Sequence, residues 1–304
     1  MKGTSQRPAD IEVFLVEHGR LVEDALDRYL PSAEISPQAV HAAMRHSVFA
    51  GGKRLRPILV IAAAEVTGMA AQDVLPSACA VELIHTYSLI HDDLPAMDDS
   101  PTRRGRPTCH VAFGEAMAVL AGDALHALAF ELLARNAAVE GCSPSRVLAA
   151  IAELGRSIGT GGMVGGQVLD LLAVGAPPDE TAVRRIHRLK TGSLIRAALR
   201  IGGVLGGADP LTLAALDQYG EHMGLAFQIV DDILDVVGEQ SKLGKRTGSD
   251  ATLAKVTFPA VFGLERSRRL AETGTRRAID ALAPVGARGD RLRELASLLL
   301  ARER

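Results

Sequence analysis

Apolar residues recur along most of the chain at intervals of three and four positions, which is the spacing of one face of a helix. The alternation of Val, Ile and Thr with polar residues that marks strands is almost absent. The pattern predicts roughly ten helices, with long ones near residues 71–93, 111–140, 144–172 and 210–237. We therefore expect an all-α protein.

Three predicted helix starts share one signature, a side-chain oxygen followed by proline: Ser36-Pro37, Ser143-Pro144 and Asp209-Pro210. Such an oxygen caps the free N–H groups of the first turn, and proline suits the first helical position. Residues 288–304 predict a last amphipathic helix with Leu292, Leu295 and Leu299 on one face. We interpret it as a helix that packs on the core.

Composition and charge narrow the class of protein. With 47% hydrophobic residues, the 304-residue chain can bury a large core. A formal net charge of −2 argues against general affinity for nucleic acid or for an anionic membrane. Cys79, Cys109 and Cys142 lack metal-site spacing and are expected to be free thiols. Met1 to Asp10 is polar, and no uncharged apolar run reaches about 20 residues, so we expect a soluble, cytoplasmic protein without membrane insertion.

Two acidic clusters are the candidate chemistry. His91-Asp92-Asp93-Leu94-Pro95-Ala96-Met97-Asp98-Asp99 holds four carboxylates at the end of an apolar helical run, and Asp231-Asp232-Ile233-Leu234-Asp235 lies much later. Pro95 cannot continue a regular helix, so a bend is expected there that brings Asp98 back beside Asp92. Asp231 and Asp235 fall one turn apart on one helix face.

Either cluster alone is explained by a solvated acidic helix end. Together they indicate a shared cation, because carboxylates this close repel one another unless they are solvated or bridged. Oxygen donors without a Cys/His set select Mg²⁺ or Mn²⁺ over zinc. Since Mg²⁺ is usually held by one or two carboxylates together with waters and substrate phosphates, the expected substrate is a phosphate ester. If both clusters build one site, residues 1–304 form a single domain.

Four cationic segments support that substrate class: Gly51 to Pro57, Arg103 to Arg106, Lys190 to Gly192 and Lys242 to Arg246. Arginine binds phosphate through two parallel hydrogen bonds. Each segment by itself is explained by a solvated face. The combination with two acidic clusters indicates bound diphosphate.

With these motifs the chain resembles the short-chain trans-prenyl diphosphate synthases, most of all the bacterial farnesyl diphosphate synthases. The matching segments are Gly51 to Pro57, Glu82 to His110, Gly166-Gln167 with Asp170, Lys190-Thr191, Phe227 to Asp235 and Leu243 to Pro259. The paired aspartate motifs with the intervening Lys-Thr are highly specific. The resemblance implies an all-helical fold around a deep cavity, usually as a homodimer.

The resemblance also implies roles for individual residues. Asp92, Asp98 and Asp231 would ligate Mg²⁺, with Asp235 as a further candidate from its spacing. Isopentenyl diphosphate would be held by Lys53, Arg56, His85 and Arg104. The allylic diphosphate would be held by Arg103, Lys190, Gln228 and Lys245, with Thr191 hydrogen-bonding at the reacting end. Asp92, Asp98, Arg103, Lys190, Asp231 and Lys245 are thus the predicted catalytic residues.

Product length is expected to depend on the helix that precedes Asp92. Tyr87 and Ser88 lie five and four residues upstream, so Tyr87 is about 7.5 Å deeper. An ordinary core tyrosine is the alternative, but in the family an aromatic ring at this offset accompanies farnesyl-length products. Geranyl and geranylgeranyl diphosphate remain alternative products.

One departure from the family and one competing motif affect the interpretation. After Asp99 the chain reads Ser100-Pro101-Thr102, where close relatives often carry more acids, and Asp92 and Asp98 stay intact. The glycine run from Gly159 to Gly166 lacks a Lys-Ser/Thr ending and a preceding strand, so we assign it to close helix packing.

Two rival functions are less well supported. A terpene cyclase surrounds its carbocation with aromatic faces, whereas only 3% of this chain is aromatic. A non-catalytic partner subunit would be expected to lack one or more of the motif charges, and none is missing.

Overall fold

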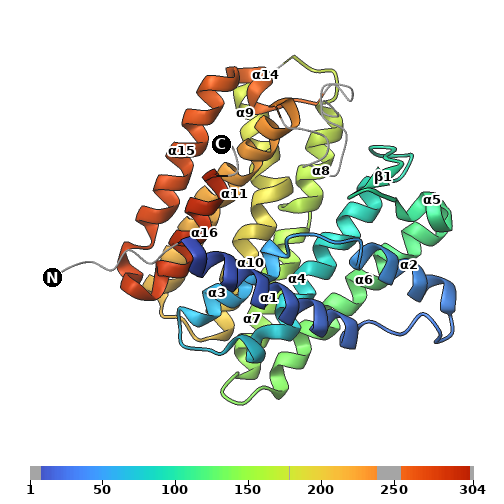
Figure 1. Cartoon of the computed structure of the whole chain (residues 1–304), viewed down its shortest axis with the longest axis horizontal. Helices are drawn as coiled ribbons and strands as arrows, with labels where there is room; N and C mark the ends of the chain where they lie inside the picture. The colour runs from blue at the N-terminus through green and yellow to red at the C-terminus, as the bar shows by residue number, and fades with distance from the viewer. Residues whose placement is uncertain (1–7, 178, 238–254, 302–304) are drawn as a thin grey trace.

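The protein, described here by a computed structural model, is a bundle of α-helices (Figure 1). The structure describes residues 8–177, 179–237 and 255–301. The helices are α1 (Pro8–Tyr29), α2 (Gln38–Val48), α3 (Leu55–Glu65), α4 (Ala71–Asp92), α5 (Cys109–Phe113), α6 (Glu115–Arg135), η1 (Asn136–Ala138), α7 (Pro144–Ile158), α8 (Met163–Leu172), α9 (Glu180–His187), η2 (Arg188–Gly192), α10 (Ser193–Leu205), α11 (Pro210–Val237), α14 (Phe258–Phe262), α15 (Leu264–Ala281), η3 (Ala283–Gly289) and α16 (Asp290–Ala301). Two short strands, β1 (Thr102–Arg103) and β2 (Arg106–Pro107), pair antiparallel. The expected all-α class is confirmed.

The core is built around α4 and α10. Helix α10 packs against α3, α4, α7 and α11, and α4 packs along α6. The middle of α4 is apolar on nearly every side, and Val74 to Ile84 is buried without a break, as expected of a helix enclosed by others. Nearly all the buried apolar residues, from Ile11 to Leu299, belong to one connected cluster. The expected single domain stays a prediction. The three cysteines are buried free thiols, as predicted.

The expected helix starts are correct in two cases of three. Ser143 Oγ accepts a hydrogen bond from Arg146 N at 3.4 Å, and Asp209 Oδ1 accepts one from Thr212 N at 2.7 Å. The predicted Ser36 cap is wrong, because α2 begins at Gln38 and its N-cap residue is Pro37, whose side chain has no acceptor. The predicted packing helix at the C-terminus is α16, which buries Leu292, Leu295 and Leu299.

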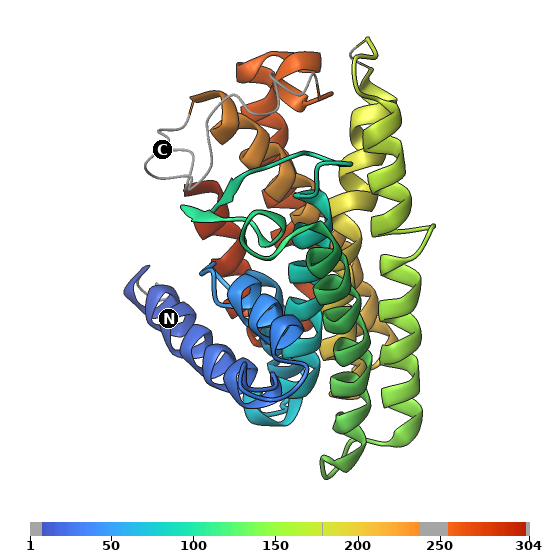
Figure 2. The ribbon, with the colours of Figure 1, turned by 90° about the vertical axis from the view of Figure 1, so that its right-hand side faces the viewer.

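Glycines divide two of the predicted long helices. The helix expected at 111–140 is split by Gly114, whose φ of +86° favours glycine, and the helix expected at 144–172 is interrupted between α7 and α8. Helices α7 and α8 follow one another along one side of the bundle (Figure 2). A Cβ atom on Gly166 would lie 2.2 Å from Lys190 N, so α8 approaches η2 more closely than any side chain allows. The close-packing interpretation of the glycine run therefore holds for Gly166, whereas Gly161 has open space beside it and Cβ atoms on Gly162 and Gly165 would meet backbone five residues earlier.

Helix α6 has an unusual surface for a helix at the edge of a bundle. Among the described residues, Glu115–Ala138 is the one helical span that is long and apolar enough to cross a membrane. Only 39% of its most apolar 18-residue stretch is buried inside the protein. It packs along α4, and core helices of soluble proteins pass the same test. Its outer side exposes Val119 and Leu120.

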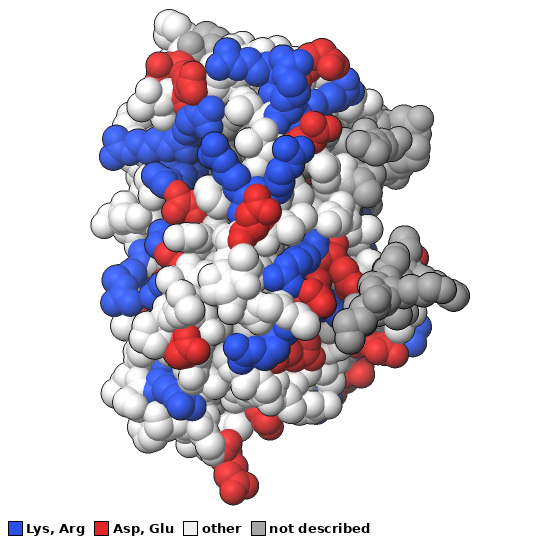
Figure 3. Space-filling model, turned by 90° about the vertical axis from the view of Figure 1, so that its left-hand side faces the viewer, with Lys and Arg blue, Asp and Glu red and all other residues white. Residues whose placement is uncertain are grey.

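Charge is mixed on the side of the molecule that carries α15. Basic side chains gather toward the end at which α14 lies, with acidic side chains between them (Figure 3). Arg268 pairs with Glu265 at 2.6 Å, and Arg266 lies over the Phe262 ring at 4.7 Å. These basic groups are partly neutralised or packed on aromatic rings, so this side has no uniformly positive field.

Candidate active site

The end of α4 bends as the sequence predicts. The helix stops at Asp92, and the chain turns through Pro95 so that Asp98 N donates a hydrogen bond to Asp92 O at 2.9 Å. A second turn bond joins Ser100 N to Asp93 O at 3.2 Å. Asp98 therefore returns beside Asp92, and both carboxylates lie at the same helix end.

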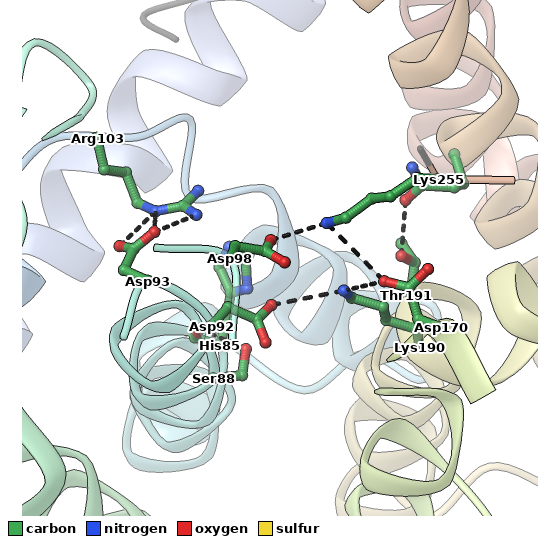
Figure 4. A network of polar contacts seen from close by, with 11 residues as sticks. His85, Ser88, Asp92, Asp93, Asp98, Arg103, Asp170, Lys190, Thr191 and Lys255 are labelled. Carbon is green, nitrogen blue, oxygen red and sulfur yellow. Dashed lines mark hydrogen bonds and ion pairs between the residues drawn. The ribbon is translucent and has the colours of Figure 1, made fainter. Parts of the chain in front are cut away.

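Two lysines bridge the carboxylates at this end (Figure 4). Lys190 Nζ lies 2.7 Å from an Asp170 carboxylate oxygen and 3.7 Å from one of Asp92. Lys255 Nζ lies 2.8 Å from Asp98 and 3.9 Å from Asp170. Three carboxylates from α4, its following turn and α8 thus surround two ammonium groups. The arrangement binds positive charge.

Burial makes this network electrostatically strong. Burial raises the pKa of Asp92 above its ordinary value, while Lys190 favours the ionised carboxylate and Asp98 opposes it. Burial lowers the pKa of Lys190, but Asp92 and Asp170 outweigh it, so the net pKa shift is upward. Lys190 therefore stays a cation where a negatively charged ligand would approach.

The position of Lys190 depends on an irregular helical segment. Residues Arg188–Gly192 form a single π-helical turn between α9 and α10, a feature that is frequent at functional sites. Thr191 Oγ1 donates to Gln228 Oε1 at 2.6 Å, which ties this turn to α11. A Cβ on Gly224 would lie 2.9 Å from Gly192 Cα, so the two backbones lie in close contact. The predicted residues Lys190, Thr191 and Gln228 are therefore brought together.

The second acidic cluster has members with different surroundings. Asp232 is 2% exposed and accepts hydrogen bonds from Gln228 Nε2 at 3.0 Å and from Phe258 N at 2.9 Å. It therefore orients Gln228 and holds the start of α14. Asp235 is also 2% exposed, whereas Asp231 is half-buried. Asp231 is thus the member of the predicted ligand pair that is more accessible.

A first cavity of about 710 Å³ is lined by the predicted isopentenyl diphosphate ligands Lys53, Arg56, His85 and Arg104. Arg56 Nη1 donates to His85 Nε2 at 3.2 Å, and Arg56 Nε is buried and has no hydrogen-bond partner among the residues that the structure describes. Burial and the adjacent Arg56 lower the pKa of His85 well below its ordinary value, so the imidazole is neutral. A buried guanidinium with an unused donor is suited to an anionic ligand.

Not every cation of the four basic segments faces a cavity. Arg54 is buried and fully occupied: it donates to Glu23 at 2.6 Å, to Glu82 at 2.7 Å and to Val48 O at 2.6 Å. Arg54 thus holds the segment in place. The predicted diphosphate ligand Arg103 makes a two-pronged ion pair with Asp93, at 2.7 and 2.8 Å. Arg103 does not line either large cavity in this state.

A second cavity of about 410 Å³ runs from a polar end to an apolar one. Its polar end includes Asp92, Lys190, Thr191 and Gln228. Its apolar part is lined by Tyr87, Ser88, Leu89, Met163, Val164, Val168, Leu171 and Leu194. Gln167 Nε2 points into buried surroundings without a hydrogen-bond partner. A ligand with a charged head and an apolar tail fits this gradient.

The two cavities share one wall. Arg56, His85 and Phe227 line both, so the cationic chamber and the chamber with the apolar tail region meet at these residues. Asp92 of α4 and Gln228 of α11 both line the second chamber. Asp231, Asp232 and Asp235 are not among the residues that line the two cavities, and Asp232 reaches the second chamber only through its hydrogen bond with Gln228.

The predicted ligand Lys245 lies outside the described residues. Among the described residues, no group of three or more His, Cys, Asp or Glu side chains is already arranged around a metal position. The lysine groups of the Asp92 network occupy the space between the carboxylates instead.

Comparison with known proteins identifies the family. A family model described as polyprenyl synthetase matches residues 37–282. The chain belongs to the polyprenyl synthetase family. It is 50% identical to farnesyl diphosphate synthase of Escherichia coli over 248 residues, which are 81% of this chain and 83% of that protein. It is also 45% identical to the heterodimeric geranylgeranyl pyrophosphate synthase large subunit 1 of Arabidopsis thaliana, over 90% of this chain and 74% of that protein.

Solved structures agree with the sequence comparisons. A crystal structure of a farnesyl/geranylfarnesyl diphosphate (FPP/GFPP) synthase from Zymomonas mobilis superposes with a TM-score of 0.86 and 36% identity, covering 97% of this chain and all of that one. The resemblance predicted from the motifs is confirmed, and the polyprenyl synthetase described here is a prenyltransferase.

Sequence reasoning assigned no role to two residues of the network, Asp170 and Lys255. Both lie inside segments that match the family, and Asp170 follows the Gly166-Gln167 pair. The signal was therefore present as a motif, but neither residue stands in an acidic or basic cluster. Only the fold shows that Lys255 pairs with Asp98.

Proposed function

We propose that the enzyme joins isopentenyl diphosphate to an allylic diphosphate, dimethylallyl or geranyl, with farnesyl diphosphate as the main product. The observation that carries the proposal is the pair of chambers that meet at Arg56, His85 and Phe227. One chamber is lined by cations, and the other joins a charged end to an apolar region. The arrangement matches two diphosphate substrates that react across a shared wall.

Magnesium is the proposed cofactor, and Mn²⁺ can replace it. The residues that would hold it are Asp92, Asp98, Asp231 and Asp235. The donor set fits a hard cation because all its donors are carboxylate oxygens, and two of its members, Asp92 and Asp98, already lie beside the ammonium groups of Lys190 and Lys255. Bound ions would neutralise the negative charge that develops on the departing diphosphate.

The chain's own residues bind and orient the two substrates. In the first chamber Lys53, Arg56 and Arg104 hold the diphosphate of isopentenyl diphosphate, and the neutral His85 hydrogen-bonds beside them. Fixed cations in a largely dry cavity stabilise oxygen anions better than water does, because they need no reorganisation.

Lys190 and Gln228, which line the second chamber, bind the allylic diphosphate. Arg103 and Lys245 are proposed as its further ligands on the family resemblance. Thr191 and Gln228 support the reacting carbon end through their mutual hydrogen bond. The apolar lining excludes water that would otherwise capture the carbocation. The proton lost after bond formation goes to the released diphosphate, so no side chain acts as general base.

The product length follows from Tyr87. Its ring lines the apolar part of the second cavity about 7.5 Å below Asp92. Burial raises the pKa of Tyr87 to about 12, so it stays an uncharged obstacle to the growing tail. Geranylgeranyl diphosphate is the second candidate product, because relatives with that product name are 43–46% identical to this chain.

Incubation with dimethylallyl diphosphate, labelled isopentenyl diphosphate and Mg²⁺ tests the proposal. Chromatography of the dephosphorylated alcohols should show farnesol as the main labelled product. Label in cyclic hydrocarbons would indicate a cyclase instead. Absence of labelled product, with intact helicity and in the presence of the metal, would indicate a non-catalytic subunit.

A homodimer in the cytoplasm is the proposed state. Helices α6 and α8 expose the apolar side chains of Val119, Leu120, Val168 and Leu172, which a second copy of the chain would cover in a dimer. Sedimentation at micromolar concentration should give twice the mass of one chain.

A further inference from the structure

A third cavity, of about 400 Å³, shares no lining residue with the two chambers of the candidate site. It lies where α7, η2, α10 and α11 pack together. The charged residues of its lining are four arginines and two glutamates: Arg156, Arg188, Arg196, Arg200, Glu153 and Glu221. The basic segments recognised in the sequence contain none of these arginines. We call this space the arginine cavity.

Two of the arginines are fixed by carboxylates on the neighbouring helices. Arg196 makes a two-pronged ion pair with Asp217 of α11, at 2.5 and 2.6 Å. Arg200 Nε lies 3.0 Å from Glu153 of α7, and its Nη1 lies 3.3 Å from Asp217. Asp217 does not itself line the arginine cavity. These pairs therefore hold two guanidinium groups in place, while positive charge stays in excess along the lining.

The other two arginines lie on the solvent side of the cavity. The side chains of Arg156 and Arg188 are 69% and 65% exposed. Each pairs through Nη2 with one glutamate, Arg156 with Glu153 at 3.1 Å and Arg188 with Glu221. A guanidinium carries five N–H donors, so both arginines keep donors for a ligand. Exposed ion pairs add little to stability, so an anion can displace these two pairs easily.

The lining favours a small anion with several negative charges. Arginine binds phosphate oxygens through parallel, charge-assisted hydrogen bonds. Among the described residues, the lining contains no aromatic ring, and Leu189 is its one large apolar side chain. A nucleotide base or a prenyl tail therefore finds no complementary surface there. Inorganic diphosphate, which prenyl transfer releases, can contact several guanidinium groups at once.

The arginine cavity and the second chamber lie on two sides of one π-helical turn. Arg188, Leu189 and Gly192 line the arginine cavity, whereas Lys190 and Thr191 line the second chamber. A displacement of Arg188 toward a bound anion would thus act on a lysine only two residues away. Two anions on opposite sides of the turn would also repel each other.

We propose that the arginine cavity binds inorganic diphosphate and that its occupation weakens the binding of the allylic diphosphate at Lys190. The released product then slows the enzyme from a site outside the two chambers. Such coupling is reciprocal, so an allylic diphosphate at Lys190 equally weakens the second anion. Binding in the arginine cavity does not depend on the proposed function, whereas the coupling rests on it through Lys190.

Calorimetric titration of inorganic diphosphate into the full chain, with a metal chelator present, tests the binding. The cations of the first chamber provide a second class of sites, so variants identify the arginine cavity. R156Q/R188Q should weaken one class by about tenfold, because it removes charge-assisted hydrogen bonds. E153Q should strengthen the same class, because it removes a carboxylate that competes with the anion. ADP should bind there no better than inorganic diphosphate.

The double variant R135Q/R268Q is the matched control for this titration. It removes two ion-paired arginines that line none of the three cavities, and it should bind diphosphate like the unmodified protein. Circular dichroism checks that every variant keeps its helices. Identical isotherms for the unmodified protein, R156Q/R188Q and E153Q would overturn the proposed site.

Initial rates with labelled isopentenyl diphosphate and excess Mg²⁺ test the coupling. Added diphosphate should raise the KM of the allylic substrate in the unmodified enzyme. In R156Q/R188Q the rise should be about fivefold smaller, and direct competition in the second chamber accounts for the remainder. Equal inhibition of the two proteins would overturn the coupling. Failure of the proposed function is a separate result, since no label would then be incorporated while the calorimetric site persists.

Discussion

The last two turns of α4 carry two regions with opposite chemistry. At the helix end, Asp92 and Asp98 lie among Lys190 and Lys255, where nearly every group is charged. About 7.5 Å deeper, Tyr87 contacts rings and the apolar lining of the second cavity. Electrostatic terms in buried surroundings reach several kcal/mol, whereas steric discrimination by an apolar pocket amounts to about 1–3 kcal/mol. We therefore propose that the charged end controls whether the reaction occurs and that the apolar region controls which product forms.

Metal removal is the most severe way to test the charged region. A chelator should abolish turnover, because the diphosphate leaving group then keeps its full negative charge. Circular dichroism should not change, since Lys190 and Lys255 hold the carboxylates without an ion. Added Mg²⁺ should restore both the rate and the original product distribution. Loss of helicity together with activity would mean that the ion is structural.

Substitution of single carboxylates should have the next largest effect. D92A or D231A is expected to lower turnover by about 10²–10³, comparable to the loss of one preorganised electrostatic contact. Far-ultraviolet circular dichroism and steady-state assays with labelled isopentenyl diphosphate provide the two measurements. D99A is the matched control from the same cluster and should stay within a few fold of the unmodified enzyme. A product-length change in D92A at a normal rate would contradict the division between the two regions.

Away from the charged end of α4, a buried ion pair joins Arg54 to Glu82 beside the first cavity. E82Q should lower the free energy of unfolding by about 3 kcal/mol, because it leaves the buried Arg54 guanidinium with an incomplete partner set. Urea unfolding followed by circular dichroism measures this. The exposed pair Arg135–Glu131 is the control, and E131Q should change stability by less than about 0.5 kcal/mol. Equal changes in the free energy of unfolding for E82Q and E131Q would show that burial of the Arg54–Glu82 pair does not add to stability.

In the apolar region, Y87A should change the product and spare the rate. Longer products should increase about tenfold relative to farnesyl diphosphate, because the ring no longer obstructs the tail, while turnover stays within a few fold. Chromatography of labelled alcohols measures both quantities. Y29A makes the same chemical change at the tyrosine packed against Arg135, away from either cavity, and should leave the products unaltered. An unchanged distribution in Y87A removes this residue from chain-length control.

The smallest expected effect is a dependence of stability on pH from His85. Its pKa is lowered in the folded state, chiefly by burial and then by Arg56, so the unfolded chain binds the proton more readily. Stability is then complete above the ordinary histidine pKa of about 6.5 and falls below it, by at most about 1.4 kcal/mol per pH unit. H85Q should lose less stability than the unmodified enzyme when pH drops from neutral to about 5. If urea unfolding shows that H85Q and the unmodified enzyme lose the same stability over this pH range, the assignment to His85 is refuted.

Much of the architecture could be predicted from local patterns. The period of apolar residues indicates helices because side chains three and four positions apart share a face, and this holds whatever the helix packs against. The bend at Pro95 and the caps at Ser143 and Asp209 likewise depend on neighbours in sequence. Motif resemblance supplied the candidate site residues, and their roles stay predictions.

Tertiary structure alone decided which of these groups meet. Lys255 pairs with Asp98 across 157 positions of sequence, and Arg54 differs from Arg56 only in whether folding brings carboxylates to it. The wall shared by Arg56, His85 and Phe227, and the contact of Tyr87 with His126, arise where separate helices pack. Local propensities determine which face of a helix is apolar, but the partner of a given side chain depends on helix packing, which no short stretch of sequence encodes.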